Sequence, residues 1–389
     1  MQVRSTRNSA AILSFMLLLI PSGFAFGQNP ASLASHVSAN VPIQGKVHAL
    51  SAERPLVPFN PAVAPQVAPP AHHWQLQATL PGTVIHDLAF ASPAVGYAAA
   101  ELGQVWKTTD GGRSWTEILN LGFPYYFYGA TALTAEKVVI SGFNDSTGDG
   151  IVRWTSDGGQ TWTDDIVIST IGWGQRVRFA NDNDGLTLDL FGNSSGNLAQ
   201  YTTDGGAAAS DWTTVVDNAS GGWFGLQFSL LSNRHTRASG VNYCTSPNSG
   251  ANWTCGPSVD SVFDGPVFFL NDTFGWVGGG EISPNVEGWA HVTTDGGKTW
   301  SGRTLDGPWP IREILFLSQK AGWAAGGNLY SGVGGIYFSG NGGQTWTVDV
   351  TTNAEMDACD KQPTSTGYRV WCAGYDGSLN GYIYTLAVK

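Results

Sequence analysis

The chain has 389 residues, of which only 13% are charged, and it contains 51 glycines and 16 tryptophans. This composition excludes a largely disordered chain and is typical of short strands joined by tight turns. The net charge of −11 argues against nucleic acid and anionic membrane surfaces as partners, because both are bound by clustered lysine and arginine.

The first 27 residues have the pattern of a signal peptide. Arg4 and Arg7 precede an apolar run over residues 10–20, and small residues follow it at 25–27. The run is too short to span a bilayer comfortably. We therefore predict a signal peptide over 1–27 and a secreted or periplasmic mature protein. No later segment is long and apolar enough for a transmembrane helix, so we expect no membrane insertion.

Residues 28–71 are rich in proline, alanine, valine and serine and show no period. This composition predicts an extended, mostly disordered linker. The rest of the chain, residues 72–389, repeats throughout and is predicted to be one folded domain.

The repeated feature is an eight-residue turn, which we call the box turn. It reads TTDGGRSW over 108–115, TSDGGQTW over 155–162, TTDGGKTW over 293–300 and SGNGGQTW over 339–346. A copy at 202–206 carries an insertion before Trp212, and a degraded copy spans 245–253. The Asp or Asn positions are 110, 157, 204, 248, 295 and 341, so a unit recurs every 44 to 47 residues. Such a period predicts a repeat architecture.

The box turns resemble the Asp-box, or BNR, repeat of sialidase-like propellers. Asp-Gly-Gly tolerates the positive φ angles of a hairpin turn, and the carboxylate and the Ser or Thr hydroxyls bond nearby backbone N–H groups. The Trp is expected to cover the turn. We therefore interpret these side chains as structural and not as catalytic. The residues expected in this role are Asp110, Trp115, Asp157, Trp162, Asp204, Trp212, Asp295, Trp300, Asn341 and Trp346.

A second signature precedes the box turns: Phe268-Phe269-Leu270, for example, leads through a polar turn to Gly275-Trp276-Val277. Each unit thus reads as four antiparallel strands, which form one propeller blade. Innermost strands are expected near residues 87, 131, 177, 226, 267, 313 and 357. The sequence therefore predicts an all-β, seven-bladed propeller of four-stranded antiparallel blades; six blades is the alternative. The last unit lacks an outermost strand, and we expect residues 73–80 to supply it and close the ring.

Residues 72–389 look most like the small seven-bladed photosystem II assembly and stability factors. That resemblance implies assembly or binding work without catalysis. The photosynthetic members use a basic, arginine-rich patch, and this acidic chain shows no such cluster in its sequence. Fold alone does not define function.

The four cysteines, Cys244, Cys255, Cys359 and Cys372, predict two disulfides, as expected of an exported chain. We favour the local pairings 244 with 255 and 359 with 372. The first would brace the degraded box turn, and the second the inner strands of the last blade. A four-cysteine zinc site is the alternative, but the close CxxC pairs that such sites favour are absent.

A ligand is expected on the face opposite the box turns, where loops lead into the innermost strands. Aromatic residues near these loops could stack on sugars or on an apolar peptide, and arginines accompany them. The alternative is that the rings pack between blades. The candidates are Tyr126, Tyr128, Trp173, Trp223, Trp309, Arg176 and Arg312.

Two functions follow. The first is a secreted, non-catalytic scaffold that binds a protein or a glycan, and we expect it to be a monomer. The alternative is a sialidase-like glycoside hydrolase, for which Glu281 with Glu313 or Asp357 is the best carboxylate pair. Against a sialidase, Arg176 and Arg178 lie two apart on one strand, and the Arg-Ile-Pro motif of sialidases is absent.

No cofactor is expected, and calcium is the one metal left open. The acidic string at 181–185 is too short for an EF-hand loop. The string at 145–150 lies in a loop of the ligand-binding face and is the better calcium candidate.

Overall fold

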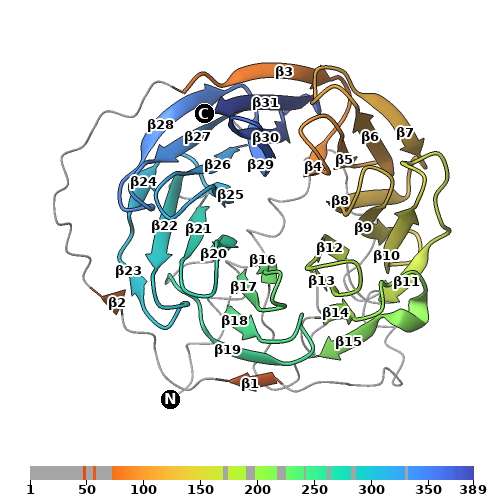
Figure 1. Ribbon diagram of the computed structural model, residues 1–389, viewed down its shortest axis with the longest axis horizontal. Helices are drawn as coiled ribbons and strands as arrows, with labels where there is room; N and C mark the ends of the chain where they lie inside the picture. The colour runs from red at the N-terminus through yellow and green to blue at the C-terminus, as the bar shows by residue number, and fades with distance from the viewer. Residues whose placement is uncertain are drawn as a thin grey trace, which may run out of the picture.

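The protein is a closed ring of seven blades around a central channel (Figure 1). The computed structural model describes residues 47–49, 56–57, 72–169, 174–189, 198–216, 225–240, 242–260, 264–281, 286–328 and 332–389. Within this part of the chain the structure is all β apart from the short 3-10 helix Ala209–Asp211. No helix in these ranges is long and apolar enough to cross a membrane.

Each blade is a four-stranded antiparallel sheet whose strands run from the channel outwards in chain order. Blades 1 to 4 consist of the following strands: β4 (Ile85–Phe90), β5 (Gly96–Ala100), β6 (Gln104–Thr108) and β7 (Thr116–Asn120); β8 (Tyr125–Ala132), β9 (Val138–Asn144), β10 (Asp149–Thr155) and β11 (Ile166–Ser169); β12 (Gly174–Phe179), β13 (Gly185–Asp189), β14 (Leu198–Thr202) and β15 (Thr213–Val216); β16 (Gly225–Leu230), β17 (Thr236–Gly240), β18 (Asn242–Ser246) and β19 (Trp253–Pro257).

Blades 5 and 6 follow the same order, whereas blade 7 takes its outermost strand from the N-terminal segment; the short β23 (Trp300–Ser301) lies outside the sheet of blade 5. Blades 5 to 7 consist of the following strands: β20 (Asp264–Phe269), β21 (Gly275–Glu281), β22 (Glu287–Thr293) and β24 (Leu305–Gly307); β25 (Ile311–Phe316), β26 (Gly322–Asn328), β27 (Val333–Ser339) and β28 (Thr347–Thr352); β29 (Glu355–Thr364), β30 (Gly367–Tyr375), β31 (Gly381–Val388) and β3 (Gln75–Leu80).

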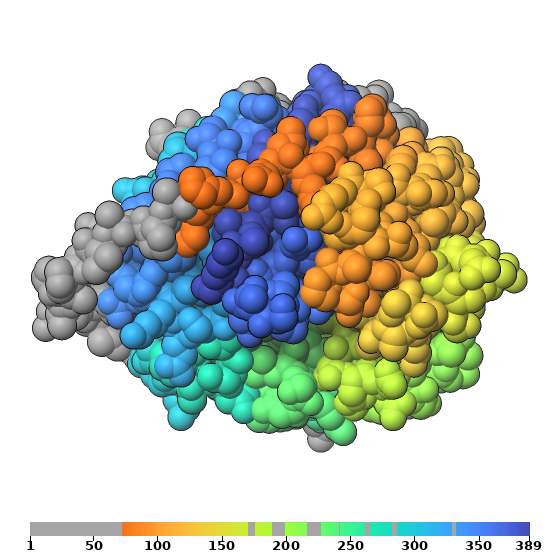
Figure 2. Space-filling model, turned by 45° about the horizontal axis from the view of Figure 1, so that its top comes forward, coloured from red at the N-terminus to blue at the C-terminus, as the bar shows by residue number. Residues whose placement is uncertain are grey.

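The N-terminal strand β3 closes the ring as predicted. It pairs antiparallel with β31, from Gln75 opposite Thr385 to Leu80 opposite Gly381. Figure 2 shows this orange strand against the dark blue C-terminal residues. Just before β3, Trp74 donates an indole N–H to Asp349 Oδ2 at 3.0 Å, and Trp323 donates to the same oxygen at 2.9 Å. The N-terminus is thus tied to blade 6 as well as to blade 7, and the seven-bladed prediction is confirmed.

The leader falls outside the described residues, as does most of the linker. The signal peptide over 1–27 and the disordered linker over 28–71 therefore stay predictions. Two short pieces of the linker are described as strands: β1 (Val47–Ala49) pairs parallel with β19, and β2 (Leu56–Val57) pairs parallel with β23.

The box turns are held by a hydrogen-bond pattern that depends on their repeated residues. In the turn at 155–162, Thr155 Oγ1 accepts the N–H of Gly159 at 2.8 Å and donates to Asp157 Oδ1 at 2.8 Å. The Asp157 carboxylate in turn accepts the backbone N–H and the hydroxyl of Thr161. These two bonds from Thr161 lower the pKa of Asp157 to about 2. Gly158 and Gly159 have φ angles of 73° and 90°, which glycine adopts without strain.

Aromatic stacking joins neighbouring blades. The Trp276 ring of β21 stacks on Phe316 of β25 with ring centres 3.6 Å apart, and its indole N–H donates to Gly342 O in the box turn of blade 6 at 2.8 Å. Gly322 lies under the same Phe316 ring, where a Cβ atom would approach it to 2.3 Å. The Phe and Gly-Trp positions of the sequence signature therefore form the contact between blades.

Both disulfides have the predicted pairing. Cys244–Cys255 joins β18 to β19, and Cys359–Cys372 joins β29 to β30. Each links residues that lie directly opposite each other on adjacent strands.

Candidate functional site

The innermost strands give the channel two different ends. All seven begin on one face of the ring, which we call the loop face, and end on the other, which carries the box turns and which we call the box face. The loop face holds the loops that lead into the innermost strands and those that join second to third strands.

Every innermost strand has an irregularity where it pairs with its second strand. The pairing skips His86 in β4, Tyr128 in β8, Arg312 in β25 and Asp357 in β29, and it shifts at the same level in β12, β16 and β20. A β-bulge re-aims side chains and disturbs the alternation along a strand. The repeated bulge therefore divides each innermost strand into a part near the loop face and a part near the box face.

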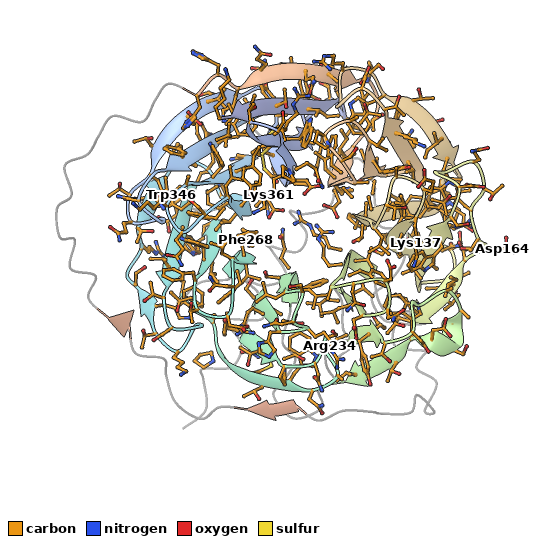
Figure 3. All side chains as sticks on the ribbon, viewed as in Figure 1. Lys137, Asp164, Arg234, Phe268, Trp346 and Lys361 are labelled. Carbon is orange, nitrogen blue, oxygen red and sulfur yellow. A yellow bond between two sulfur atoms is a disulfide. The ribbon has the colours of Figure 1, made fainter. Side chains whose placement is uncertain are left out.

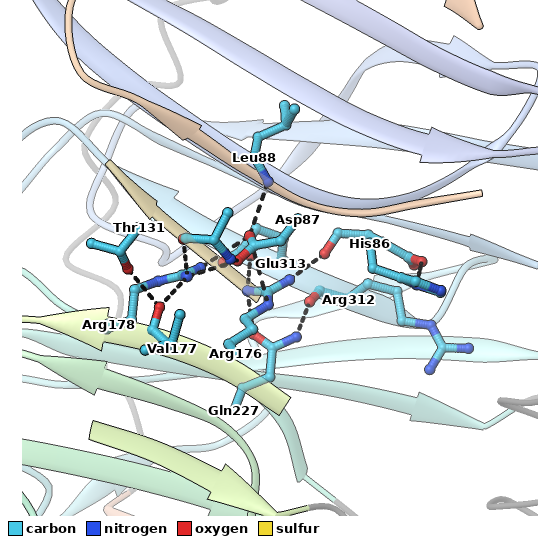
Figure 4. A network of polar contacts seen from close by, with 12 residues as sticks. His86, Asp87, Leu88, Thr131, Arg176, Val177, Arg178, Gln227, Arg312 and Glu313 are labelled. Carbon is cyan, nitrogen blue, oxygen red and sulfur yellow. Dashed lines mark hydrogen bonds and ion pairs between the residues drawn. The ribbon is translucent and has the colours of Figure 1, made fainter. Parts of the chain in front are cut away.

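A layer of paired charges crosses the channel at the level of the bulges (Figure 4). Arg178 of β12 binds Asp87 of β4 through two nitrogens, Nη1 to Oδ2 at 2.7 Å and Nη2 to Oδ1 at 3.1 Å. Arg176 of the same strand donates to Glu313 of β25 and to Gln227 of β16. The Gln227 amide continues to the backbone oxygen of Arg312 at 2.8 Å. These side chains connect blades 1, 3, 4 and 6.

The pKa values of the charged groups in this layer depend on their partners. Burial opposes the charge of Arg178, but Asp87 outweighs it and raises the pKa of the guanidinium. Burial also raises the pKa of Glu313, and Arg176 opposes that effect. Asp87 has only 1% of its side chain exposed and also accepts the N–H groups of Leu88 and Ala130. A buried charge with this many partners acts as a structural element.

On the loop-face side of the layer, His86 lies between two carboxylates. Its Nε2 is 3.3 Å from Glu101 Oε1, and its Nδ1 is 3.7 Å from Asp357 Oδ2. The Tyr128 ring lies 4.4 Å from the imidazole and the Tyr375 ring 5.7 Å from it. Burial opposes the imidazolium, but Asp357 and Glu101 outweigh it and raise the pKa of His86 to about 9. His86 is therefore a cation held in an acidic, aromatic surrounding.

The two tyrosines beside His86 are not activated nucleophiles. Burial raises the pKa of both Tyr128 and Tyr375 well above the usual value, and nearby carboxylates, Glu101 and Asp357 respectively, add to the shift. A nucleophile is activated by a lowered pKa or by an adjacent free base. Both hydroxyls are therefore protonated at neutral pH.

On the box-face side of the layer lies a cavity of about 340 Å³. Its inner end is formed by Arg176, Arg178, Gln227 and Glu313, and its walls combine apolar side chains with polar groups. Asp360 and Lys361 of β29 also line it, and Phe268 and Lys361 lie on the inner side of the ring (Figure 3).

The predicted ligand residues are placed in different surroundings. Arg176 belongs to the charge layer, and Arg312 Nε is 2.7 Å from Glu355 Oε1. Tyr126 and Tyr128 lie within β8 and not in a loop, and both rings stack on Phe143. Trp309 packs 5.5 Å from Tyr337. Trp173 and Trp223 lie outside the described residues.

The three predicted carboxylates have different surroundings. Glu313 accepts from Arg176 in the charge layer, Asp357 faces His86, and Glu281 is the last residue of β21. Asp145 lies in the turn between β9 and β10. Over the described ranges, no three His, Cys, Asp or Glu residues are arranged to hold a metal ion.

The cavity lies on the face opposite the one on which the sequence predicted a ligand. Phe268, Asp360 and Lys361 line the box-face side and were not candidates. Burial raises the pKa of Asp360 to about 6 and lowers that of Lys361 to about 8. A sequence signal was present, since β29 places two adjacent charged residues in an innermost strand.

Large apolar side chains are exposed mainly on the loop face. Of the eight exposed examples in the described part of the chain, five lie in or next to its loops: Leu102, Phe123, Val286, Val333 and Leu379. The other three, Leu76, Val167 and Val348, lie on outermost strands. Leu102 and Leu379 have φ angles of 55° and 62°, a conformation that large side chains rarely adopt.

These features define a seven-bladed β-propeller whose channel is crossed by a layer of ion pairs. Solved structures of the same fold include YCF48 bound to a D1 peptide, with 17% identity and a TM-score of 0.61 over 87% of this chain and 100% of that chain. YCF48 from Cyanidioschyzon merolae has 19% identity and a TM-score of 0.57 over 80% and 98%.

The fold is shared more widely than these two structures. The WD40 propeller domain of Doa1 has 10% identity and a TM-score of 0.56 over 80% of this chain and 97% of that chain. No family model and no curated protein matches the sequence. At these identities the likeness defines the fold alone.

Proposed function

We propose that this protein is an exported, non-catalytic propeller that binds a basic protein partner through its loop face. The observation that carries the proposal is the set of exposed apolar residues there, which includes Phe123 at 60% exposure. Exposed apolar side chains gathered on one face are typical of a protein interaction site.

The backbone at two of these positions supports the proposal. Leu102 and Leu379 lie at turns between second and third strands of the neighbouring blades 1 and 7, with positive φ angles. Glycine or asparagine would fit such turns with less strain. An exposed leucine at each therefore gives the fold no local advantage and suits a contact with a partner.

The charge of this face supports a basic partner. By sequence, the loops of the loop face contain no lysine or arginine, and they carry Asp145, Asp217 and Asp376. They also carry Glu101 and Asp260, which are buried and paired with His86 and Arg303. The turns of the box face carry basic residues, such as Arg113, Lys137 and Lys298, together with a larger number of acidic ones, such as Asp157 and Asp272. An acidic surface around apolar contacts favours a partner with positive charge and apolar anchors.

Binding is favoured over hydrolysis because the carboxylates near the channel are engaged in pairs. A glycosidase needs one carboxylic acid and one carboxylate flanking the scissile bond. Glu313 is paired with Arg176 and Asp357 faces His86. A likeness in fold to YCF48 bound to a D1 peptide also agrees with a protein ligand. Two disulfides suit an exported protein.

The test uses the two left-handed leucines. The variant Leu102→Asn/Leu379→Asn removes apolar contacts while keeping a residue type that tolerates positive φ, so its melting temperature should equal or exceed that of the wild type. Val348→Ser, at an exposed apolar position of an outermost strand (51% exposed), is the matched control. Each protein is immobilised, incubated with an envelope extract of the source cells and eluted with rising salt.

We expect a basic protein that is retained by the wild type and by Val348→Ser, lost by the double variant, and eluted as salt screens the charges. Equal retention by both variants would overturn the proposed face. Cleavage or binding of a glycan on an array, with no protein retained, would instead favour the carbohydrate alternative.

A further inference from the structure

The box-face cavity is a second site, separated from the loop face by the layer of ion pairs. Its volume of about 340 Å³ lies within the range of about 300–1,000 Å³ that is usual for small-molecule sites. Phe179 of β12, Leu230 of β16 and Phe268 of β20 are among its apolar wall residues. The cavity therefore offers apolar contacts next to charged groups and suits a ligand that has both an apolar and a polar part.

Arg178 offers hydrogen-bond donors at the inner end of this cavity. Its two hydrogen bonds to Asp87 use one hydrogen of Nη1 and one of Nη2. Nη1 also donates to the backbone oxygens of Ala130 and Val177. In the described part of the chain, the Nε–H and the second Nη2–H have no partner. The Arg178 side chain is 29% exposed, whereas that of Asp87 is 1% exposed.

These two free hydrogens lie on the same edge of the guanidinium. Such an edge binds the two oxygens of a carboxylate through parallel hydrogen bonds. Because Asp87 occupies the other edge, the charge of Arg178 stays fixed in place whether or not a ligand is present. The free edge is thus a preformed donor pair.

The other charged groups of the cavity leave this donor pair accessible. Glu313 is engaged by Arg176 and by the N–H of Ile314. The Asp360 carboxylate accepts the N–H groups of Phe90 and Lys361. Lys361 lies 5.0 Å from the centre of the Phe268 ring and donates to Phe316 O. Two arginines and a lysine therefore face the cavity, and each carboxylate there already accepts hydrogen bonds from the protein.

We propose that the box-face cavity binds a carboxylate carried on an apolar body. The carboxylate lies against the free edge of Arg178, and the apolar body lies among Phe179, Leu230 and Phe268. The same chemistry is found in a free aromatic or branched carboxylic acid and in the carboxyl terminus of a peptide that ends in an apolar residue. This proposal does not depend on the partner of the loop face.

The test compares matched acid and amide probes by calorimetry and by fluorine NMR. The free acid is 4-(4-fluorophenyl)butanoate, and the peptide is acetyl-Gly-Ser-Gly-Phe with a free carboxyl terminus; each is paired with its amide. We expect at least one of the two acids to bind at least about tenfold more tightly than its own amide. The reason is that the amide cannot form the two charge-assisted hydrogen bonds of the carboxylate. Binding of the butanoate alone identifies a small-molecule site, and binding of the peptide alone identifies a site for a chain end.

Two variants assign the binding to the cavity. Arg178→Lys keeps a positive charge beside Asp87 but lacks the planar donor pair and should weaken acid binding about tenfold. Because it also loses hydrogen bonds to Asp87, it should lower the melting temperature, so binding is measured at a temperature at which the variant is folded. Ala132→Trp, at a wall residue that is not part of the charge layer, places a large side chain in the cavity and should abolish binding. The matched control is Arg153→Lys, whose arginine pairs with Asp165 at 2.6 Å on blade 2. Equal binding of acid and amide, binding by neither acid, or unchanged binding in both cavity variants would overturn the proposal.

Discussion

Asp87 shows how a single side chain connects separate blades. Its carboxylate accepts the N–H of Leu88 in its own blade, the N–H of Ala130 in blade 2 and two hydrogen bonds from Arg178 in blade 3. A buried carboxylate is costly unless each of its oxygens is satisfied. The position of blades 1 to 3 around the channel is therefore coupled to this one group.

His86 makes stability depend on pH. Its pKa in the folded protein is about 9, above the value of about 6.5 for an unfolded histidine. A raised histidine pKa contributes stability that is fully present below pH 6.5 and is lost as the pH rises through 9. The contribution is on the order of 3 kcal/mol, because each pKa unit corresponds to about 1.4 kcal/mol.

This prediction is tested by urea unfolding of the wild type and His86→Gln from pH 6 to 10. The wild type should be the more stable at pH 6, and the difference should vanish by about pH 10. Lys361, whose pKa burial lowers to about 8, changes stability with pH in the opposite sense, and it cancels in the difference because both proteins contain it. A constant difference across the range would contradict the role given to His86.

Thr293 tests the role of the hydroxyl in a box turn. Its Oγ1 accepts the N–H of Gly297 at 2.9 Å and donates to Asp295 Oδ1 at 2.8 Å. Thr293→Val keeps the shape but leaves a buried N–H without its acceptor, which should lower the free energy of unfolding by about 1–3 kcal/mol. Thr293→Ser is the control, because Ser246 and Ser339 make the same bonds in other box turns. Equal unfolding midpoints for the two variants would contradict this account.

At the scale of elements, β3 is the strand on which closure of the ring depends. It pairs with β31 alone in its sheet, and Trp74 before it reaches Asp349 in blade 6. A chain that starts at Gly82 should therefore melt well below one that starts at His72, because blade 7 keeps three strands and the ring opens between its first and last residues.

A peptide of residues 72–81 provides the rescue for this experiment. Added to the shortened chain, it should raise the melting temperature with increasing concentration, since it binds only the folded state. A scrambled peptide of the same composition is the control. Equal melting temperatures for the two chains would show that β3 does not close the ring energetically.

The innermost strands explain which part of the site was predictable. The sequence periodicity located all seven, and they begin at residues 85, 125, 174, 225, 264, 311 and 355, one to six residues before the expected positions. The aromatic run at 125–128 proved to be strand and not loop. The bulges could not be predicted, because skipping one residue changes which side chains face the channel without leaving a pattern in the sequence.

At the scale of the whole molecule, the two faces differ in chemistry. The loop face exposes apolar side chains and its loops carry no lysine or arginine, whereas the turns of the box face carry both acidic and basic residues and the cavity lies on that side. The charge layer lies between them. Acidic residues are in excess in the loops of both faces, in keeping with the net charge of −11, and the faces differ in that only the box-face turns carry basic residues.

The sequence by itself determined the repeat, the four-stranded blade, the closing strand and both disulfides. These features depend on local chemistry: turn residues at fixed spacing, apolar runs of strand length and cysteines on facing strands. Only the tertiary structure decided that Arg176, Arg178, Asp87 and Glu313 cross the channel as pairs and that a cavity lies on the box face. Those contacts join residues as far apart as 176 and 313, and their geometry depends on ring closure and on bulges, which no local pattern encodes.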